Sequence, residues 1–241
     1  MFGRRKKGAA APETTEESAQ ELQAVEVEDV PAPPSRPQGP WDDADVPDDE
    51  VNRIDLGGLL VPVPPDTEVR VDVSPEGEVI AATLVQGQSA MQVNAFAAPR
   101  SYGIWSEVRE EIGTTLREGG GEAQDVEGPH GTELHAAVPT EVPGEGAGLA
   151  PARFIGVDGP RWFLRAMLTG PAATDPEAAA ELEAALRDVV VVRGGDPMAV
   201  RDPLPLRLPK QVVEAAEQGP APSEEPALAL PERGPEITEL H

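Results

Sequence analysis

Acidic, proline-rich residues at both ends of this chain confine any hydrophobic core to its middle. Residues 8–50 carry 13 acidic side chains against one arginine, Arg36, and residues 210–241 carry seven against two basic ones. Segments with like charges, frequent proline and few apolar residues bury too little surface to offset the loss of chain entropy on folding. We therefore expect disordered acidic arms at residues 1–50 and 210–241, and a single globular domain at residues 51–209.

The composition also excludes several classes of site and of protein. The chain has no cysteine, which rules out disulfides, thiolate metal sites and cysteine nucleophiles. No window approaches the roughly 20 apolar residues of a membrane span, and no apolar stretch follows the basic start MFGRRKK, unlike in a secretory signal. A net charge of -25 disfavours direct binding of duplex nucleic acid and favours a basic partner. We expect a cytoplasmic protein without a membrane span.

The first part of the domain shows the period-2 alternation of β-strands. Strands are expected at residues 69–73, 79–85 and 90–97, joined by short turns into an antiparallel meander. The side chains expected on the core face of the third strand are Met91, Val93, Ala95 and Ala97.

The period then changes to that of an amphipathic helix. Apolar residues recur every four positions between Ile104 and Leu116, with Trp105 beside that stripe. Ser101 is the expected N-cap, and the glycines at 119–121 are expected to end the helix. This helix should pack on the sheet by one face.

Three further strands are expected at residues 131–138, 152–157 and 161–169, with an exposed loop at 139–151. Asp158 and Gly159 are expected to form a two-residue hairpin turn, since Asp-Gly suits the positive φ angles of a type I′ turn.

A second helix should begin at Thr174 or Asp175, with Pro176 in its first turn, and lead into a strand at 190–192. The predicted order is β-β-β-α-β-β-β-α-β. The expected fold class is α+β: a mostly antiparallel sheet packed with two amphipathic helices, with disordered acidic arms at both ends.

Five stretches of the chain together resemble a known family. They are MFGRRKK, NAFAAPRSYGIWSEVREEI, GPHGTEL, GVDGPRWFLRAMLTG and VVVVRGGDPMAVRDPLPLRLP. Over roughly residues 50–209 the chain resembles an actinobacterial family, domain of unknown function 3710. The resemblance implies no activity. Genes of that family often lie near those for a dUTPase and an OB-fold protein, which implies a nucleotide or nucleic-acid context. The element order also resembles PsbP-like sandwiches, mostly binding and assembly factors, although a shared fold does not assign a function.

His130, Glu133 and His135 are the candidates for metal binding or catalysis. A zinc motif with two His at i and i+4 requires a helix, whereas Gly131 and the β pattern indicate a strand. We therefore expect a His–Glu pair on the sheet surface, with no metal and no cofactor. No G-x-S-x-G motif occurs, and the glycine runs follow elements rather than precede a helix as in phosphate loops. The sequence favours a protein that is not an enzyme, without excluding one.

Arginine and aromatic residues are the candidates for partner binding. Alternation places Arg161, Phe163 and Arg165 on one face of their strand and the apolar Trp162, Leu164, Ala166 and Leu168 on the other, core-facing side. An open Arg-Phe-Arg face suits an anionic ligand or an acidic peptide. Alternatively, these arginines neutralise the acids of the chain itself. Arg100 and Trp105, at the start of the first helix, complete the set of candidate binding residues.

Two further segments allow two interpretations each. Trp41 either packs on the neighbouring domain or anchors a partner, and VRDPLPLRLP, residues 200–209, either packs along the domain edge or serves as a partner's ligand. As function we expect a non-catalytic binding or assembly module that uses the Arg/aromatic face. The alternatives are an enzyme or small-ligand domain with a cleft near His130, Glu133 and His135, and an accessory protein of nucleic-acid metabolism. The partner and oligomeric state stay open.

Overall fold

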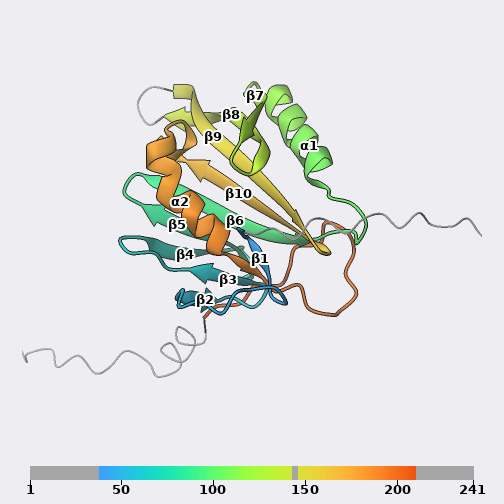
Figure 1. Ribbon diagram of the computed structural model, residues 1–241. Helices are drawn as coiled ribbons and strands as arrows, with labels where there is room; N and C mark the ends of the chain where they lie inside the picture. Colours follow the sequence, from blue (N-terminus) through green and yellow to red (C-terminus); the bar gives the residue numbers. More distant parts are fainter. Residues whose placement is uncertain (1–37, 143–145, 210–241) are drawn as a thin grey trace, which may run out of the picture. The chain divides into compact units, whose positions relative to one another are not determined.

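The computed structural model describes residues 38–142 and 146–209, so the disorder predicted for residues 1–37 and 210–241 lies outside the described residues. A seven-stranded antiparallel sheet forms the centre of this part of the chain (Figure 1). Its strands, in spatial order, are β4 (Glu68–Val73), β5 (Val79–Gln86), β6 (Ser89–Ala97), β10 (Trp162–Thr169), β9 (Gly146–Gly159), β8 (Gly131–Val142) and β7 (Glu122–Gly128).

A second, smaller sheet and two helices complete the fold. The small sheet has the order β1 (Trp41–Asp42), β11 (Val190–Val191), β3 (Leu59–Pro62) and β2 (Arg53–Asp55), and its β1–β11 pair is parallel. The helices are α1 (Trp105–Glu118) and α2 (Pro176–Asp188), and a short 3-10 helix, η1 (Gly170–Ala173), precedes α2.

Each face of the large sheet has its own hydrophobic core. On one face, α2 and the small sheet cover Trp162, Leu164 and Leu168 of β10, which are the core residues predicted for that strand. On the other face, α1 packs mainly on β7, β8 and β9 and encloses Leu134 and Phe163. The predicted α+β class with two amphipathic helices is confirmed.

Four strands were not predicted, and each carries a weak pattern. The sequence of β7, EAQDVEG, forms a polar edge strand with little apolar alternation, and β2 and β3 are short and lie close to prolines. The short β1 belongs to residues 38–50, which were assigned to the disordered arm. There the backbone N–H of Trp41 donates to Val189 O (2.9 Å), and the side chain of Trp41 is half-buried, so this tryptophan packs on the fold.

The β9–β10 hairpin turns two residues later than the sequence indicated. Gly159 pairs with Trp162, so Pro160 and Arg161 form the turn, and Asp158 lies within β9. Proline has the φ that the first turn position needs, and Arg161 accepts a positive φ of 64° at the second. The expected loop at residues 139–151 is also wrong, because strands β8 and β9 extend through most of it.

The segment after β11, residues 196–208, forms a strap along the end of β6. The backbone N–H of Leu204 donates to Ala95 O (2.9 Å), and Leu206 bridges to both Gly57 and Val79. Leu204 is buried, as the packing interpretation of VRDPLPLRLP predicts, whereas Leu208 is 38% exposed. The strap therefore joins the small sheet to the large one.

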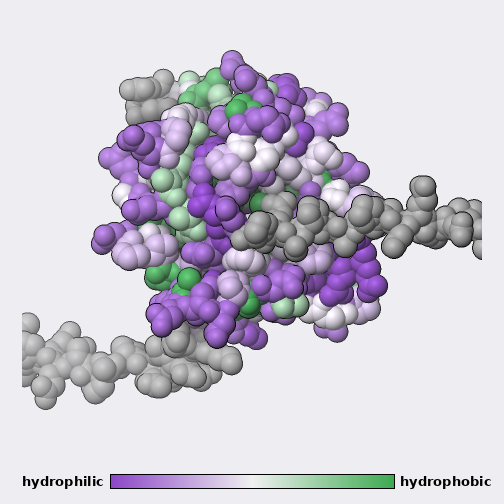
Figure 2. Space-filling model, viewed as in Figure 1, coloured by the Kyte–Doolittle hydropathy of each residue, from purple (hydrophilic) through white to green (hydrophobic). Residues whose placement is uncertain are grey.

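The face of this domain that Figure 2 shows is largely hydrophilic. In Figure 2, purple residues predominate on the face in view, and the green ones form small separate areas. Among the described residues, no helix combines the length and apolar character needed to cross a membrane.

Candidate functional site

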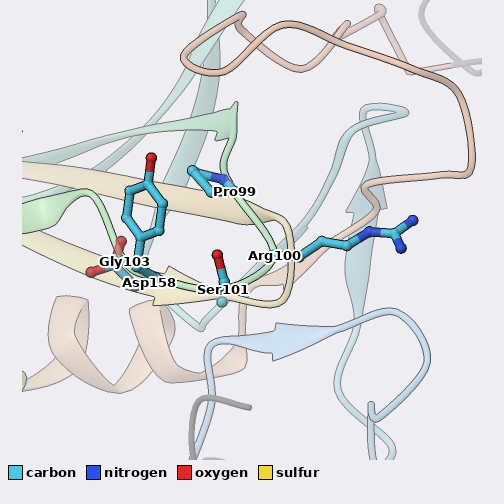
Figure 3. Close-up of a pocket in the computed structure, with 7 residues that line it drawn as sticks. Pro99, Arg100, Ser101, Gly103 and Asp158 are labelled. Atoms are coloured by element: carbon cyan, nitrogen blue, oxygen red, sulfur yellow. The ribbon is translucent and has the colours of Figure 1, made fainter. Parts of the chain in front are cut away.

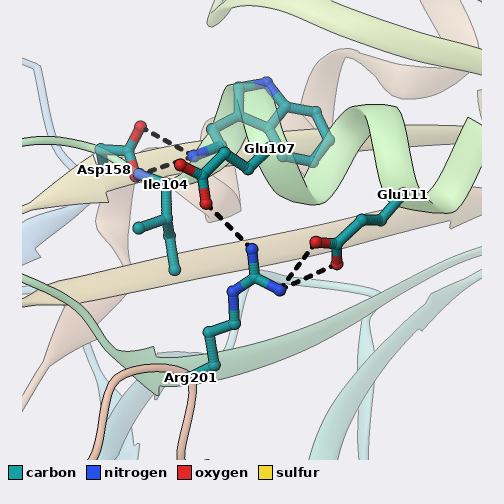
Figure 4. A network of polar contacts seen from close by, with 6 residues as sticks. Ile104, Glu107, Glu111, Asp158 and Arg201 are labelled. Carbon is teal, nitrogen blue, oxygen red and sulfur yellow. Dashed lines mark hydrogen bonds and ion pairs between the residues drawn. The ribbon is translucent and has the colours of Figure 1, made fainter.

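Helix α1 is capped by a residue from a distant hairpin. Its N-cap, Ile104, supplies no capping side chain; instead the carboxylate of Asp158 accepts hydrogen bonds from the N–H groups of Ile104 (2.8 Å) and Trp105 (3.3 Å) (Figure 4). The prediction of Ser101 as N-cap is therefore wrong. Gly103 permits this arrangement, because a Cβ there would overlap the carboxylate of Asp158. A carboxylate at this position also interacts favourably with the helix dipole.

Two ion pairs between Arg201 of the strap and glutamates of α1 hold the same helix to the strap. The guanidinium of Arg201 lies 3.0 Å from a carboxylate oxygen of Glu107 and 2.8 Å from one of Glu111 (Figure 4). These two glutamates lie one turn apart on the exposed side of α1. The exposed side of α1 therefore contacts the strap.

An aromatic column connects α1 to the sheet. The rings of Phe96 and Phe163 are stacked with centroids 6.1 Å apart, and those of Phe163 and Trp105 with centroids 5.9 Å apart. An arginine lies over each end, with Arg165 5.6 Å from the Phe96 ring centroid and Arg109 5.6 Å from that of Trp105. The indole N–H of Trp105 also donates to Thr132 O (2.6 Å).

The predicted Arg161–Phe163–Arg165 face is not an open patch. Phe163 is 1% exposed because α1 covers it, and Trp105 is likewise buried. Arg161 lies in the hairpin turn rather than in the strand, and its guanidinium donates to Gly194 O (3.0 Å). Of the two arginines in the predicted patch, Arg165 is the one that lies over an aromatic ring, that of Phe96, at the edge of the area that α1 covers.

Beyond Arg165, strands β6, β5 and β4 present a polar surface that α1 does not cover. Asp72 accepts hydrogen bonds from Thr83 Oγ1 (2.8 Å) and Gln92 Nε2 (2.8 Å), and Asn94 lies opposite Arg165 in the strand register. These side chains are all half-buried. We call Arg165, Phe96, Asn94, Gln92, Thr83 and Asp72 the uncovered sheet face.

Arg165 has an unusual electrostatic environment for a chain with 44 acidic residues. Its guanidinium is half-buried, and its one hydrogen bond to a described side chain is a long one, 3.4 Å, to Asn94 Oδ1. Burial lowers the pKa of Arg165, and no carboxylate among the described residues offsets that shift. Asn94 and Phe96 were missing from the sequence-based candidates, since only the β6–β10 register brings them beside Arg165.

The fifth candidate, Arg100, lines a pocket near the start of α1 (Figure 3). The pocket has a volume of about 210 Å³ and lies between the β6–α1 loop and the end of β9. Its lining residues are Pro99, Arg100, Ser101, Tyr102, Gly103, Asp158 and Gly159.

Glu133 belongs to a buried ionic cluster and not to a surface pair. Arg153 on β9 contacts both carboxylate oxygens of Glu133 on β8, with Nη2 3.0 Å from Oε1, and its Nη1 lies 2.7 Å from Glu183 on α2. The side chains of Glu133, Arg153 and Glu183 are at most 10% exposed. His135 is nearby, with Nε2 3.8 Å from Glu133. The cluster ties α2 to the sheet.

His130, in the β7–β8 turn, lies beside this cluster without joining it. Its Nε2 is buried and has no hydrogen-bond partner among the described residues. Within residues 38–142 and 146–209, no three His, Asp or Glu side chains are grouped so as to hold a metal ion. The arrangement places a half-buried imidazole near carboxylates that are already paired with arginine.

We expect His130 to make folding stability depend on pH. Burial lowers its pKa below 6.5, an effect that Arg187 and Arg153 reinforce and that Glu183 and Glu133 oppose. The unfolded chain then binds more protons than the native one between the lowered pKa and about 6.5, so stability falls as the pH falls through this window, by at most about 1.4 kcal/mol per pH unit. Urea unfolding at pH 7.5 and 5.5 should show a smaller loss for His130→Gln than for the wild type. Equal losses would contradict this assignment.

Comparisons with known proteins identify the family of the chain. No curated protein and no solved structure matches it, so the likeness to PsbP-like sandwiches stays a prediction. The model of a family described as "Protein of unknown function (DUF3710)" matches residues 39–215. That match begins before β1, in agreement with the place of β1 in the folded domain. The chain therefore belongs to the DUF3710 family of proteins of unknown function.

Proposed function

We propose that this protein is a non-catalytic binding module that recognises a carboxylate of an acidic peptide through Arg165 on the uncovered sheet face. The single observation that carries the proposal is the half-buried guanidinium of Arg165, which has no carboxylate partner among the described residues. Removing a charge from water is costly unless an opposite charge compensates. An uncompensated arginine is therefore expected where a ligand provides the missing anion.

Comparison with Arg153 strengthens this argument. Arg153 is also removed from solvent, but two carboxylates of the same chain, those of Glu133 and Glu183, contact it. Glu133 and Glu183 thus compensate Arg153, whereas Arg165 makes, within the described ranges, a single long hydrogen bond to an amide oxygen. If Arg165 had only a structural role, we would expect carboxylates of the chain to contact it, as they contact Arg153.

The surroundings of Arg165 suit a peptide. Stacking on Phe96 orients the planar guanidinium, which can then donate two parallel hydrogen bonds to a carboxylate. Thr83 and Gln92 donate to Asp72, and this fixes their oxygens, which can then accept hydrogen bonds from the N–H groups of a peptide backbone. The net charge of -25 repels acidic molecules at long range, so selection depends on short-range contact and not on electrostatic steering.

We expect Arg165→Met to abolish peptide binding without reducing stability. Methionine keeps an unbranched apolar stem over Phe96 and removes the uncompensated charge, so the free energy of unfolding should stay the same or rise by about 1 kcal/mol. Full-length protein would be used to select random decapeptides from a display library. Enrichment of Asp and Glu should occur with the wild type and be absent with Arg165→Met.

Arg207→Met is the matched control. It also removes one arginine charge, but Arg207 lies on the strap, is exposed and pairs with Asp55. The control should select the same acidic peptides as the wild type. The proposal is wrong if Arg165→Met still enriches acidic peptides, or if it lowers the free energy of unfolding by more than about 1 kcal/mol, which would indicate a structural role.

A further inference from the structure

The uncovered sheet face carries a negative charge as well as the positive charge of Arg165. The carboxylate belongs to Asp72 on β4, whose side chain is half-buried. Asp72 forms no ion pair with any described residue, and the arginine of the same strand, Arg70, is paired with Glu68 (2.7 Å). A charge that is partly removed from water is stabilised by an opposite charge. At Asp72, as at Arg165, a ligand can provide that charge.

Two hydrogen bonds hold the carboxylate of Asp72 in position and leave one of its oxygens available. Thr83 Oγ1 and Gln92 Nε2 both donate to Oδ2, each over 2.8 Å, whereas Oδ1 accepts no hydrogen bond from a described residue. A carboxylate accepts about four hydrogen bonds. A cationic donor can therefore bind to Oδ1 while Thr83 and Gln92 keep their contacts with Oδ2.

Arg165 and Asp72 lie at opposite ends of one row across the sheet. Arg165 pairs with Asn94 of β6, Asp72 pairs with Ala81 of β5, and the β5–β6 pairing extends as far as Ala82, the next residue of β5. Strands β10 and β4 are three strand spacings apart, so about 14 Å separates the backbones at the two charged residues (Figure 1). No ion pair joins their side chains, so a ligand that neutralises both must carry two opposite charges.

We propose that the uncovered sheet face binds an extended peptide with one acidic and one basic side chain about four residues apart, the acid at Arg165 and the base at Asp72. Side chains at positions i and i+4 of an extended chain lie on the same side and about 13 Å apart, which matches the length of the row. This inference rests on the proposed function and adds a second anchor to it.

The overall charge of the protein favours such a ligand over a purely acidic one. A net charge of -25 repels an acidic peptide and attracts a basic group. A peptide that carries one acid and one base is neutral overall and avoids most of this repulsion. The base bound at Asp72 thus allows an acid to reach Arg165 on a strongly negative protein.

Selection of random decapeptides with the full-length protein tests the second anchor. Peptides enriched by the wild type should carry Lys or Arg about four positions from Asp or Glu. Asp72→Asn should still enrich Asp and Glu but no longer Lys or Arg. Asparagine keeps an oxygen that accepts the hydrogen bonds from Thr83 and Gln92, so the thermal midpoint should stay close to that of the wild type. Asp66→Asn, a change of one exposed acid in the β3–β4 loop, is the matched control and should select the same peptides as the wild type.

The affinity of the most enriched peptide measures the strength of the second contact. In one version of that peptide, glutamine replaces its Lys or Arg. The wild type and Asp66→Asn should bind the glutamine version about tenfold more weakly, because a charge-assisted hydrogen bond is lost. Asp72→Asn should bind both versions with equal affinity.

The possible outcomes distinguish this inference from the proposed function. Enrichment of Asp and Glu without Lys or Arg would agree with the role of Arg165 and overturn the second anchor. A tenfold preference for the basic side chain that persists in Asp72→Asn would show that this side chain binds elsewhere. If the wild type enriches no acidic residue, the proposed function is wrong and this inference fails with it.

Discussion

Replacing Arg153 with methionine is expected to lower the free energy of unfolding by about 3–5 kcal/mol. The change removes the cation that Glu133 and Glu183 share and leaves two carboxylates almost without solvent between β8, β9 and α2. A buried charge without a partner is far more costly than a broken surface ion pair. Chemical denaturation of the purified full-length protein, followed by circular dichroism, measures the loss.

Two further variants serve as controls for Arg153→Met. Arg207→Met, which breaks an exposed pair with Asp55, should change the free energy of unfolding by less than about 0.5 kcal/mol. Replacing Glu133 and Glu183 with leucine together with Arg153→Met should recover much of the loss, because no uncompensated carboxylate then remains. If Arg153→Met is as stable as Arg207→Met, the cluster is accessible to solvent in solution.

Phe163→Ala is expected to destabilise the protein by about 3–5 kcal/mol as well. The ring of Phe163 is 1% exposed and lies between Phe96 and Trp105, so its removal opens a cavity beneath α1 and breaks two stacking contacts. The same denaturation experiment measures the effect, and the fluorescence of Trp105 should change with it. Phe163→Leu fills most of the cavity and should cost less than half as much.

A small effect of Phe163→Ala on stability would contradict the burial of Phe163 beneath α1. An open sheet face with Phe163 at its surface would tolerate alanine with a loss of less than about 0.5 kcal/mol. Such a result would restore the Arg-Phe-Arg patch that the sequence suggests. It would also mean that Trp105 of α1 does not cover Phe163 in solution.

Phe163 shows why the candidate site could be predicted only in part. Alternation along β10 assigns Phe163 and Arg165 to one face, and the register agrees. Alternation does not reveal whether another element covers that face. Helix α1 covers the part of the face that contains Phe163, and Gly156 allows this because it has no side chain and admits the Trp105 ring. One helix therefore buries Phe163 and leaves Arg165 only half-buried.

Asp158 also shows that local sequence patterns do not reveal contacts between distant residues, here in a single helix-capping interaction. The residue precedes a glycine, and the pair is a strong local signal for a turn. In the structure the turn is formed by Pro160 and Arg161, and Asp158 caps a helix whose N-cap residue, Ile104, lies 54 residues earlier. No local pattern records a contact over that separation, so the sequence indicated Ser101, a common capping residue type just before the helix, as the N-cap.

The sequence by itself determined the meander of β4, β5 and β6, both helices, the start of α2 to within one residue, at Thr174 or Asp175, and the core face of β10. These features depend on periodicity and on capping residues within a few positions of one another, which short-range sterics and burial control. Only the tertiary structure decided which side of the sheet each helix covers. That packing is what pairs Arg153 with Glu133 and Glu183, places Asp158 in a pocket and leaves Arg165 without an acidic partner among the described residues.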